Sequence, residues 1–391
     1  MAAGPSRCAA TSSPHVHHPL TEDRRRIVLT LLERVCGDRP AIVAEQPVGH
    51  AWAPVTRLRL DRVLPDGGST VIVKTRRVDG EGHGGPAHLR REYAGLCLAA
   101  SAGVAPRVLG FDDAAGVIAI TDLGPWPTVE AVLLGDDDAA ARRAMVELGR
   151  AVGRLHAATR MVTQPRTSPE AACDVPLDPI VDWASIEAVC DAHGFPDARV
   201  ARADVAALHA RLVWPAPYIG LVHMDLNPTN ALVTPDGVKL VDFEGATRGH
   251  LGFDAAFLHY PFPTYSAHWA TLPDDVAREA DRAYRAALAP ALPRGALARY
   301  DDMLATGAAA ALVLRVQRLA KLVDPAQPPE ERWRRRAQLV QQIRVFEQLA
   351  AHPLPVLGAW FTRLAGAMAD RWLDATTPAP APFPAFRSGT R

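Results

Sequence analysis

Three observations predict an α+β protein with a small antiparallel β-sheet lobe and a larger, mostly helical lobe. Short segments with strand-like alternation fall between residues 41 and 122. From residue 125 onward, apolar residues recur at helical spacing, as Met145, Leu148 and Val152 do. The third observation is length, because 391 residues suffice for two lobes that each bury a core.

The two ends of the chain differ from these lobes. Residues 1–22 mix Pro, Ser, Ala and His without periodicity, which predicts a disordered tail. We expect the small lobe over residues 23–124 and the helical lobe over residues 125–376. Residues 377–391 are rich in Pro and are predicted to form a second tail.

Charge and cysteine content exclude several classes of function. Lys+Arg and Asp+Glu both number 43, so nothing indicates a general polyanion-binding surface, and we expect no nucleic-acid partner. The five cysteines are widely spaced and form no CxxC pair, which favours a reducing cytoplasm over a disulfide framework. No apolar run is long enough to span a bilayer, so we expect no membrane partner. Composition makes no prediction of the oligomeric state.

Local patterns predict the elements of the small lobe. Helices are expected at residues 22–36 and 87–100, and strands at residues 55–60, 70–75, 104–111 and 117–120. Alternation along the second strand puts Ile72 and Lys74 on one face. There Lys74 is placed to hold a phosphate and Ile72 to pack on a nucleotide base. A lysine that merely snorkels from a strand end is the alternative. Glu92 is placed to pair with Lys74, with a solvated glutamate as the alternative.

The larger lobe is predicted to contain a series of helices joined by Pro-rich loops. Helices are expected at residues 142–157, 183–193, 197–212, 254–259, 274–289, 297–323, 329–350 and 356–373. Residues 161–179 and 261–263 are predicted to be loops. No internal repeat is apparent.

A β-hairpin inside the helical lobe carries the residues with the clearest chemistry. Its strands, residues 231–234 and 238–241, flank a Pro-Asp-Gly turn. Asp225 and Asn230 precede the first strand and Asp242 follows the second, so strand pairing brings two carboxylates and an amide together. Such oxygen ligands suit Mg²⁺, which takes its other ligands from water and substrate phosphates. A purely polar surface hairpin is the alternative.

The motif His223-x-Asp225-x₄-Asn230, followed by Asp242-Phe243-Glu244, resembles the aminoglycoside phosphotransferase-like family of small-molecule kinases. Lys74 and Glu92 extend the resemblance into the small lobe. Because this family is similar to protein kinases in fold, the resemblance implies a two-lobed, protein-kinase-like architecture. It also implies that the small lobe binds nucleotide and that the large lobe holds the catalytic loop, the metal site and the acceptor pocket.

The resemblance implies a role for each matching residue. Asp225 would orient the acceptor hydroxyl and take its proton, while Asn230 and Asp242 would hold Mg²⁺. His223 and Asp254 would support the catalytic loop. The residues implied for binding ATP, with GTP as the alternative nucleotide, are Ile72, Lys74, Glu92, Asp122, Leu123 and Leu232.

Within that nucleotide set the resemblance assigns different contacts. Lys74 would reach the phosphates, positioned by Glu92. The adenine would lie between Ile72 and Leu232, and the backbone of residues 121–123 would supply hydrogen bonds to its edge.

A small molecule with a hydroxyl group is the predicted acceptor, for example an aminoglycoside-like antibiotic, a sugar or an amino alcohol. Eleven residues separate Asp242 from Asp254, too few for the activation loop on which protein kinases dock peptides. Carboxylates that a polycationic acceptor would need are Asp274, Asp275, Asp301 and Asp302, unless they are solvated charges at helix ends. Aromatic residues that would line a less polar pocket, unless they belong to the core, are Trp183, Tyr260, Phe262, Tyr265 and Trp269.

A catalytically silent, nucleotide-binding regulatory protein on the same fold is the alternative function. Residues 47–54, the loop expected to cover the phosphates, have a single glycine and include the bulky Trp52. Close approach of backbone to phosphate usually requires glycine. Every charged position of the catalytic set is nevertheless present, which favours an active enzyme.

Overall fold

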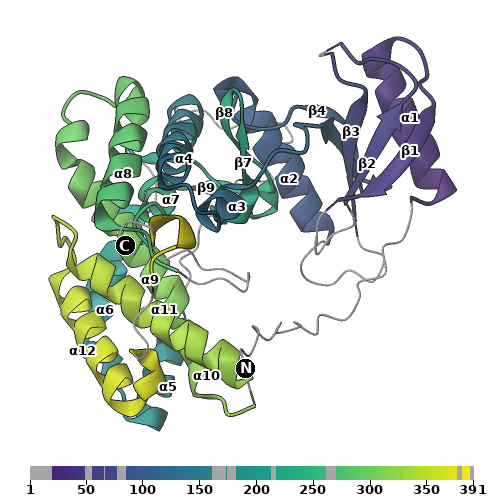
Figure 1. Ribbon diagram of the computed structural model, residues 1–391. Helices are drawn as coiled ribbons and strands as arrows, with labels where there is room; N and C mark the ends of the chain where they lie inside the picture. Colours follow the sequence, from purple (N-terminus) through teal and green to yellow (C-terminus); the bar gives the residue numbers. More distant parts are fainter. Residues whose placement is uncertain are drawn as a thin grey trace, which may run out of the picture. The chain divides into compact units, whose positions relative to one another are not determined.

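The computed structural model describes residues 20–48, 55–65, 67–76, 85–160, 173, 182–212, 217–260, 270–326, 328–376 and 381–387 (Figure 1). The chain divides into two compact units. Unit 1 comprises residues 1–89 and 108–122, and unit 2 comprises residues 90–107 and 123–391. The predicted α+β class is confirmed, with an antiparallel sheet in unit 1 and a mostly helical unit 2. Residues 1–19 and 49–54, which include most of the predicted tail and Trp52, lie outside the described residues.

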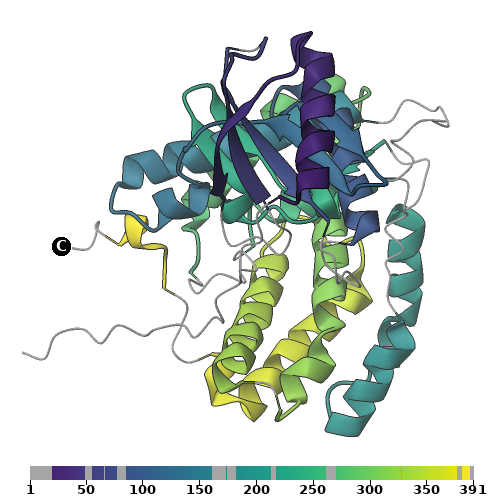
Figure 2. The ribbon, with the colours of Figure 1, turned by 90° about the vertical axis from the view of Figure 1, so that its right-hand side faces the viewer.

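Unit 1 is a five-stranded antiparallel sheet with one helix against it (Figure 2). Its strand order is β1-β2-β3-β5-β4, with bounds β1 Ile42–Pro47, β2 Val55–Leu60, β3 Thr70–Thr75, β4 Val108–Asp112 and β5 Val117–Thr121. Alternation along β3 buries Val71 and Val73 in the core, while Ile72 and Lys74 are half-buried on the other face. The expected strand over residues 104–111 begins only at Val108, because residues 100–102 still turn as a short 3₁₀-helix.

Helix α1, Glu22–Cys36, covers the buried face of this sheet. Thr21 caps its start by accepting a hydrogen bond from the Arg24 N–H at 3.3 Å. Its apolar stripe buries Val28 and Leu32 among the strand residues of the core. The helix comes so close to β4 that a side chain at Gly110 would meet Leu31 at 2.7 Å, which explains the glycine there.

Unit 2 consists of helices around two small antiparallel sheets. The helices are α2 Pro86–Ala99, which begins in unit 1, α3 Val129–Leu133, α4 Asp138–Thr159, α5 Trp183–His193, α6 Arg202–Leu212, α7 Gly252–Ala256, α8 Asp274–Leu288, α9 Tyr300–Val316, α10 Leu319–Val323, α11 Pro329–Glu347 and α12 Pro355–Arg371. The strands are β6 Ile219–Val222 paired with β9 Thr247–His250, and β7 Ala231–Thr234 paired with β8 Gly237–Leu240. The expected helix over residues 297–323 is divided into α9 and α10 by a turn at Gln317 and Arg318.

Glycines allow the central helices of unit 2 to cross closely. Helices α4 and α8 lie side by side (Figure 1), and a Cβ at Gly149 would stand 2.1 Å from the Ala280 carbonyl oxygen. At the crossing of α7 and α9, a Cβ at Gly307 would stand 1.8 Å from the carbonyl carbon of Gly252. At each of these crossings the two helices therefore pack backbone against backbone, with no room for a side chain at the glycine.

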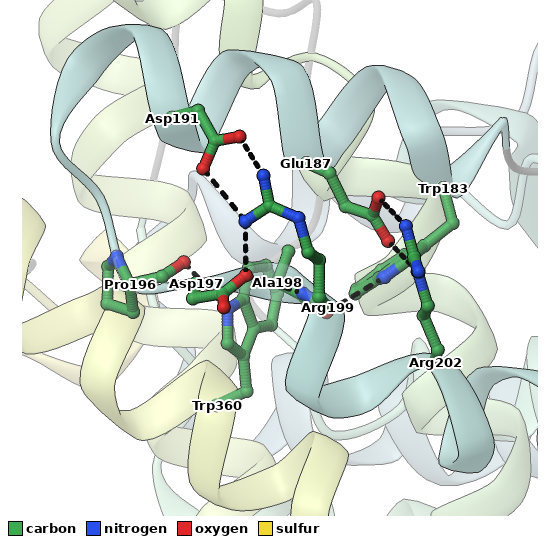
Figure 3. A network of polar contacts seen from close by, with 9 residues as sticks. All are labelled: Trp183, Glu187, Asp191, Pro196, Asp197, Ala198, Arg199, Arg202 and Trp360. Atoms are coloured by element: carbon green, nitrogen blue, oxygen red, sulfur yellow. Dashed lines mark hydrogen bonds and ion pairs between the residues drawn. The ribbon is translucent and has the colours of Figure 1, made fainter.

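A polar network joins α5 to the start of α6 (Figure 3). Arg202 donates two hydrogen bonds to Glu187, at 2.6 and 2.5 Å, and Arg199 pairs with Asp191 and Asp197. The indole of Trp183 donates to the Ala198 carbonyl at 3.0 Å.

Helix α12 completes this helical group from the far end of the chain. Its Trp360 packs edge-on against Trp183, with ring centroids 5.2 Å apart. Asp204 of α6 caps α12, because its carboxylate accepts hydrogen bonds from the Val356 and Leu357 N–H groups at 2.7 and 2.9 Å. Residues 381–387 also pack on unit 2, where Phe383 is buried. The Thr271 N–H donates to the Ala381 carbonyl, and the Phe383 N–H donates to the Thr271 carbonyl. No helix of the described ranges is long and apolar enough to cross a membrane.

We predict that Gly307→Ala lowers the free energy of unfolding, because the added methyl group displaces backbone at the α7–α9 crossing. The expected loss is about 3 kcal/mol, at the upper end of overpacking costs. Gly366→Ala in α12 is the matched control, since a Cβ there meets nothing within 4 Å, and its stability should change by no more than about 1 kcal/mol. Urea denaturation of both variants measures this, and equal effects would contradict the prediction.

Candidate active site

A loop that follows β6 presents the His223-x-Asp225 motif. Pairing of β6 with β9, from Ile219 opposite His250 to Val222 opposite Thr247, fixes where this loop begins. His223 is fully buried, whereas the Asp225 side chain reaches the surface. The strand pair therefore delivers one polar residue to the interior and the other to solvent.

The carboxylate of Asp254 on α7 clamps this loop. Its oxygens accept hydrogen bonds from the His223 N–H at 2.6 Å and from the Met224 N–H at 3.1 Å. Met224 has φ 68°, a left-handed conformation that is unfavourable for a side chain of its size. Because Asp254 is fully buried, the two charge-assisted bonds form out of water and hold Met224 in this conformation.

Two further buried residues, which the sequence analysis missed, extend this cluster: one contacts Asp254 and the second contacts the first. His156 of α4 lies with its Nε2 atom 3.2 Å from the Asp254 carboxylate, and its Nδ1 atom lies 2.8 Å from the hydroxyl of Tyr284 on α8. Both side chains are buried. The signal was available, because His156 continues the buried stripe of Leu148 and Val152 at four-residue spacing and is its polar member.

The imidazole of His223 ties the loop to the hairpin. Its Nε2 atom donates to the Val241 carbonyl at 3.0 Å, and its ring lies 4.6 Å from that of Phe243. These contacts join the residues on both sides of Asp242 to the start of the catalytic loop.

Asp225 and Asn230 meet directly. The Asn230 amide donates to the Asp225 carboxylate at 3.0 Å and to the Asp225 carbonyl at 3.1 Å. Although Asp225 reaches the surface, the protein around its carboxyl displaces water and raises the pKa of that group. The negative charge of Asp242 raises this pKa further, whereas His223, Asn230 and Arg315 act in the opposite direction.

The predicted hairpin brings Asp242 back toward this pair. Strands β7 and β8 pair from Ala231 opposite Leu240, and beyond them the Val241 N–H donates to the Asn230 carbonyl at 2.9 Å. Asp242 then turns with φ 71°. Asn230 and Asp242 therefore stand at adjoining ends of the hairpin, as the sequence analysis expected.

The donor set fits a metal that is shared with a substrate. Asn230 uses its amide nitrogen for Asp225, which leaves its carbonyl oxygen as the ligand atom, and Asp242 adds a carboxylate. Within the described ranges, no group of three or more His, Cys, Asp or Glu side chains could hold a metal ion unaided. Such a site suits Mg²⁺, whose remaining ligands come from water and phosphate.

The nucleotide residues predicted for the small lobe divide between the units. In unit 1, Ile72 and Lys74 share one face of β3, as predicted. The Asp122 carboxylate is nearly buried and is held by Arg57 of β2 at 2.6 and 3.1 Å. Glu92 is buried on α2 and belongs to unit 2. Its pairing with Lys74 stays a prediction.

In unit 2, Leu232 is joined to the segment that follows Leu123. Thr128 forms an isolated antiparallel bridge with Leu232, and the Val233 N–H donates to the Pro127 carbonyl at 2.9 Å. Leu232 is half-buried on β7. The segment after Leu123 thus runs beside the strand that carries the predicted adenine contact.

Three of the four predicted acceptor carboxylates lie in ion pairs at helix ends. Asp275 of α8 pairs with Arg142 at 2.6 Å, and Asp301 and Asp302 of α9 pair with Arg285 at 3.1 Å and with Arg211 at 3.2 Å. Asp274 is exposed in the first turn of α8. Of the aromatic candidates, Trp183 and Tyr260 are buried and hydrogen-bonded to backbone, whereas Phe262, Tyr265 and Trp269 lie outside the described residues.

Comparisons with known proteins agree with the motif. The profile of the phosphotransferase enzyme family matches residues 62–297, more than half of the chain, which confirms the predicted family resemblance. No curated protein sequence matches the chain significantly.

Several solved structures are similar to this chain. A choline/ethanolamine kinase family protein from Mesorhizobium loti is 18% identical, with 81% of this chain and 92% of that chain covered and a TM-score of 0.44. A macrolide 2'-phosphotransferase from Brachybacterium faecium is 19% identical, with coverages of 84% and 99% and a TM-score of 0.45. A choline kinase from Cryptosporidium parvum is 11% identical, with coverages of 90% and 96% and a TM-score of 0.49.

A buried histidine at the end of β9 predicts a dependence of stability on pH. Burial lowers the pKa of His250, at the end of β9, to about 4, and Arg211 and His156 add to the shift. Between pH 6.5 and about 4, the unfolded chain binds a proton that the folded protein does not, so stability falls as pH falls. We predict that His250→Gln removes roughly 3 kcal/mol of this change, at ~1.4 kcal/mol per pH unit. Urea denaturation across this pH range measures it, and an unchanged pH slope in the variant would contradict it.

Proposed function

Because the chain belongs to the phosphotransferase enzyme family, we propose that it transfers the γ-phosphoryl group of ATP to a hydroxyl group of a small molecule. The observation that carries this proposal is the contact of Asp225 with Asn230 at the hairpin end that leads to Asp242. Phosphoryl transfer requires little covalent work from the protein, so positioning and charge neutralisation are the main tasks.

Asp225 is the proposed catalytic base. Its carboxylate would hold the acceptor hydroxyl in line and accept its proton. The raised pKa suits this task, because a more basic carboxylate takes a proton more readily. The hydrogen bond from Asn230 and the clamp of Asp254 on the preceding residues fix the direction in which the carboxylate points.

Asn230 and Asp242 are the proposed metal ligands. Mg²⁺ bound there with the nucleotide would neutralise charge on the phosphate oxygens. Asn230 would contribute its carbonyl oxygen, since its amide nitrogen is engaged by Asp225. His223 and Asp254 would act as supports of the loop, in agreement with their buried contacts.

The residues proposed for ATP are those that the family resemblance implies. Lys74, positioned by Glu92, would contact the phosphates, while Ile72 and Leu232 would enclose the adenine. Because the Asp122 carboxylate is hydrogen-bonded to Arg57, residues 122 and 123 would bind adenine through their backbone, as the resemblance implies.

A small acceptor is favoured over a protein substrate. The residues between Asp242 and Asp254 are filled by a short 3₁₀-helix, Phe243–Gly245, by β9 and by the start of α7. Nothing in this segment is left to form a peptide-docking loop. The acceptor panel consists of antibiotics, sugars and amino alcohols, each tested with the purified protein and either ATP or GTP.

We predict that Asp225→Asn lowers kcat by 10²- to 10⁴-fold, the range typical of a general base, while the affinity for Mg²⁺–ATP stays within about threefold. Steady-state kinetics and nucleotide titration measure the two quantities. Asp236→Asn, in the exposed hairpin turn, is the matched control and should retain wild-type turnover. Undiminished turnover by Asp225→Asn would refute the assignment, and a wild-type protein that binds Mg²⁺–ATP but transfers to no acceptor would favour the silent alternative.

We predict that Lys74→Met weakens nucleotide binding by about 10-fold or more, because the phosphates lose a charge-assisted contact. Thermal unfolding of the nucleotide-free protein should change little, since Lys74 is only half-buried, on the face of β3 opposite the core residues Val71 and Val73. Lys321→Met, exposed on α10, is the matched control. A loss of thermal stability with unchanged nucleotide affinity would show that Lys74 has a structural role instead.

A further inference from the structure

A line of buried polar contacts runs from helix α8 through α4 to the loop that presents Asp225. The hydroxyl of Tyr284 on α8 lies 2.8 Å from Nδ1 of His156 on α4, and Nε2 of His156 lies 3.2 Å from the Asp254 carboxylate. The same carboxylate accepts from the N–H of Met224, the residue before Asp225, at 3.1 Å. Tyr284, His156 and Asp254 are each fully buried and belong to unit 2, so solvent does not compete for these contacts.

The direction of each hydrogen bond follows from the chemistry of the groups. A neutral imidazole has one N–H and one lone pair, and a carboxylate only accepts, so the His156 proton lies on Nε2 and is donated to Asp254. Nδ1 then carries the lone pair and accepts from the Tyr284 hydroxyl. The opposite tautomer would direct the Nε2 lone pair at a negative charge. The two contacts of His156 therefore favour one tautomer.

The hydroxyl of Tyr284 is well placed to be this donor. Burial, with the negative charges of Asp254 and Asp281 added, raises the pKa of Tyr284 well above its ordinary value, so the hydroxyl keeps its hydrogen. Its ring meets the imidazole edge-on, with centroids 5.5 Å apart and an angle of 89° between the planes. Gly153 lets α4 lie against α8 at this point, because a Cβ there would stand 2.6 Å from the Tyr284 carbonyl oxygen. Close packing thus fixes the donor relative to its acceptor.

A doubly protonated His156 is the alternative. Its Nδ1–H would donate to the Tyr284 oxygen, and the hydroxyl hydrogen would then lose its acceptor. Among the described residues, the Tyr284 hydroxyl hydrogen-bonds with His156 alone, so that hydrogen would be buried without a partner, which is costly. The neutral ring pairs both of its nitrogens and the hydroxyl hydrogen, and it is therefore the form that the contacts favour.

We propose that Tyr284 is a positioning residue for phosphoryl transfer that acts through His156, because its hydroxyl holds the imidazole with the Nε2–H directed at Asp254. This inference rests on the phosphotransferase function proposed above and deepens it. It assigns to helix α8 a part in the alignment of the proposed base, although α8 supplies no residue that touches the reacting groups in that proposal.

Loss of the Tyr284 hydroxyl would reach the base in three steps. Nδ1 of His156 would become an unpaired buried acceptor, and the ring could turn away from the carboxylate. Asp254 would then lose one donor, and Met224, which it holds at φ 68°, would lose part of its support. Because Asp225 directly follows Met224, its carboxylate would move with the loop, and a displacement of about 1 Å can cost about 100-fold in rate.

The first test is a double-mutant cycle on the full-length protein, with ATP and the acceptor that the panel above identifies. Tyr284→Phe removes one oxygen and keeps the ring. We expect kcat to fall by about 5- to 10-fold, the value of one hydrogen bond, while KM for Mg²⁺–ATP and for the acceptor stays within about twofold. His156→Leu should lose about 100-fold in kcat. In that background Tyr284→Phe should change kcat by less than about twofold, because its effect passes through His156.

Two further variants separate positioning from stability. His156→Gln keeps an N–H donor for Asp254 and should retain most of the activity that His156→Leu loses. Tyr218→Phe is the matched control, because the buried Tyr218 hydroxyl also donates one hydrogen bond, to the Ala296 carbonyl at 2.6 Å. Both tyrosine variants should lose similar thermal stability, whereas Tyr218→Phe should keep the wild-type kcat.

Hydrogen exchange tests the same line of contacts without activity. The His223 and Met224 amides both donate to Asp254. In the nucleotide-free protein, we expect them to exchange about 5- to 10-fold faster in Tyr284→Phe than in the wild type or in Tyr218→Phe, because the loop opens more often.

Three results would overturn the Tyr284 proposal. They are a kcat in Tyr284→Phe equal to that of Tyr218→Phe, a loss on Tyr284→Phe that persists in full in the His156→Leu background, and unchanged exchange of the two loop amides. If His156→Leu does not fold, the comparison of Tyr284→Phe with Tyr218→Phe decides, in kcat and in amide exchange. Failure of the wild type to transfer to any acceptor refutes the phosphotransferase function itself, and amide exchange then still decides whether Tyr284 holds the loop.

Discussion

The loop that presents Asp225 depends on the buried carboxylate of Asp254. Two main-chain N–H groups of the loop donate to it, one to each oxygen, and His156 contacts the oxygen that also accepts from the His223 N–H. A buried carboxylate is costly unless hydrogen bonds satisfy it, so these donors and the carboxylate require one another. The conformation of Met224, unfavourable alone, is maintained by this mutual dependence.

The packing of unit 2 places the members of this cluster. Asp254 comes from α7, His156 from α4 and Tyr284 from α8, and glycines of α4 bring that helix into backbone contact with α8. Gly153 of α4 faces the Tyr284 carbonyl so closely that a Cβ would stand 2.6 Å from it. Small residues at the crossings therefore set the distance across which His156 and Tyr284 hydrogen-bond.

Periodicity and turn signals in the sequence predicted much of the fold, because they are local. Helix α1, strands β2 and β3, and helix α5 have the expected bounds. Strands β6 and β9 were not predicted, since each has four residues and β9 reads Thr-Arg-Gly-His, with no strand-like alternation. Strand β1 was not predicted either, because it is a largely exposed edge strand that ends in proline.

For the site, the motif spacing predicted that Asp225, Asn230 and Asp242 meet, because a hairpin brings its own ends together. The contacts of His156 and Tyr284 were not predictable in the same way. Each depends on how helices far apart in the sequence pack, and a single sequence does not encode that packing in a local pattern. The polar break in the α4 stripe at His156 was the one visible trace.

The capping of α12 by Asp204 has a consequence for how the protein is made. The two partners are separated by 152 residues, with the whole catalytic loop and hairpin between them. The ribosome therefore releases the residues proposed for catalysis before α12 is available to pack against α5 and α6. Contacts of such long range are slow to form, so the nascent chain exposes Trp183 until α12, with its Trp360, has been synthesised. We expect chains terminated before residue 355 to engage chaperones, although they contain every residue proposed to act in catalysis.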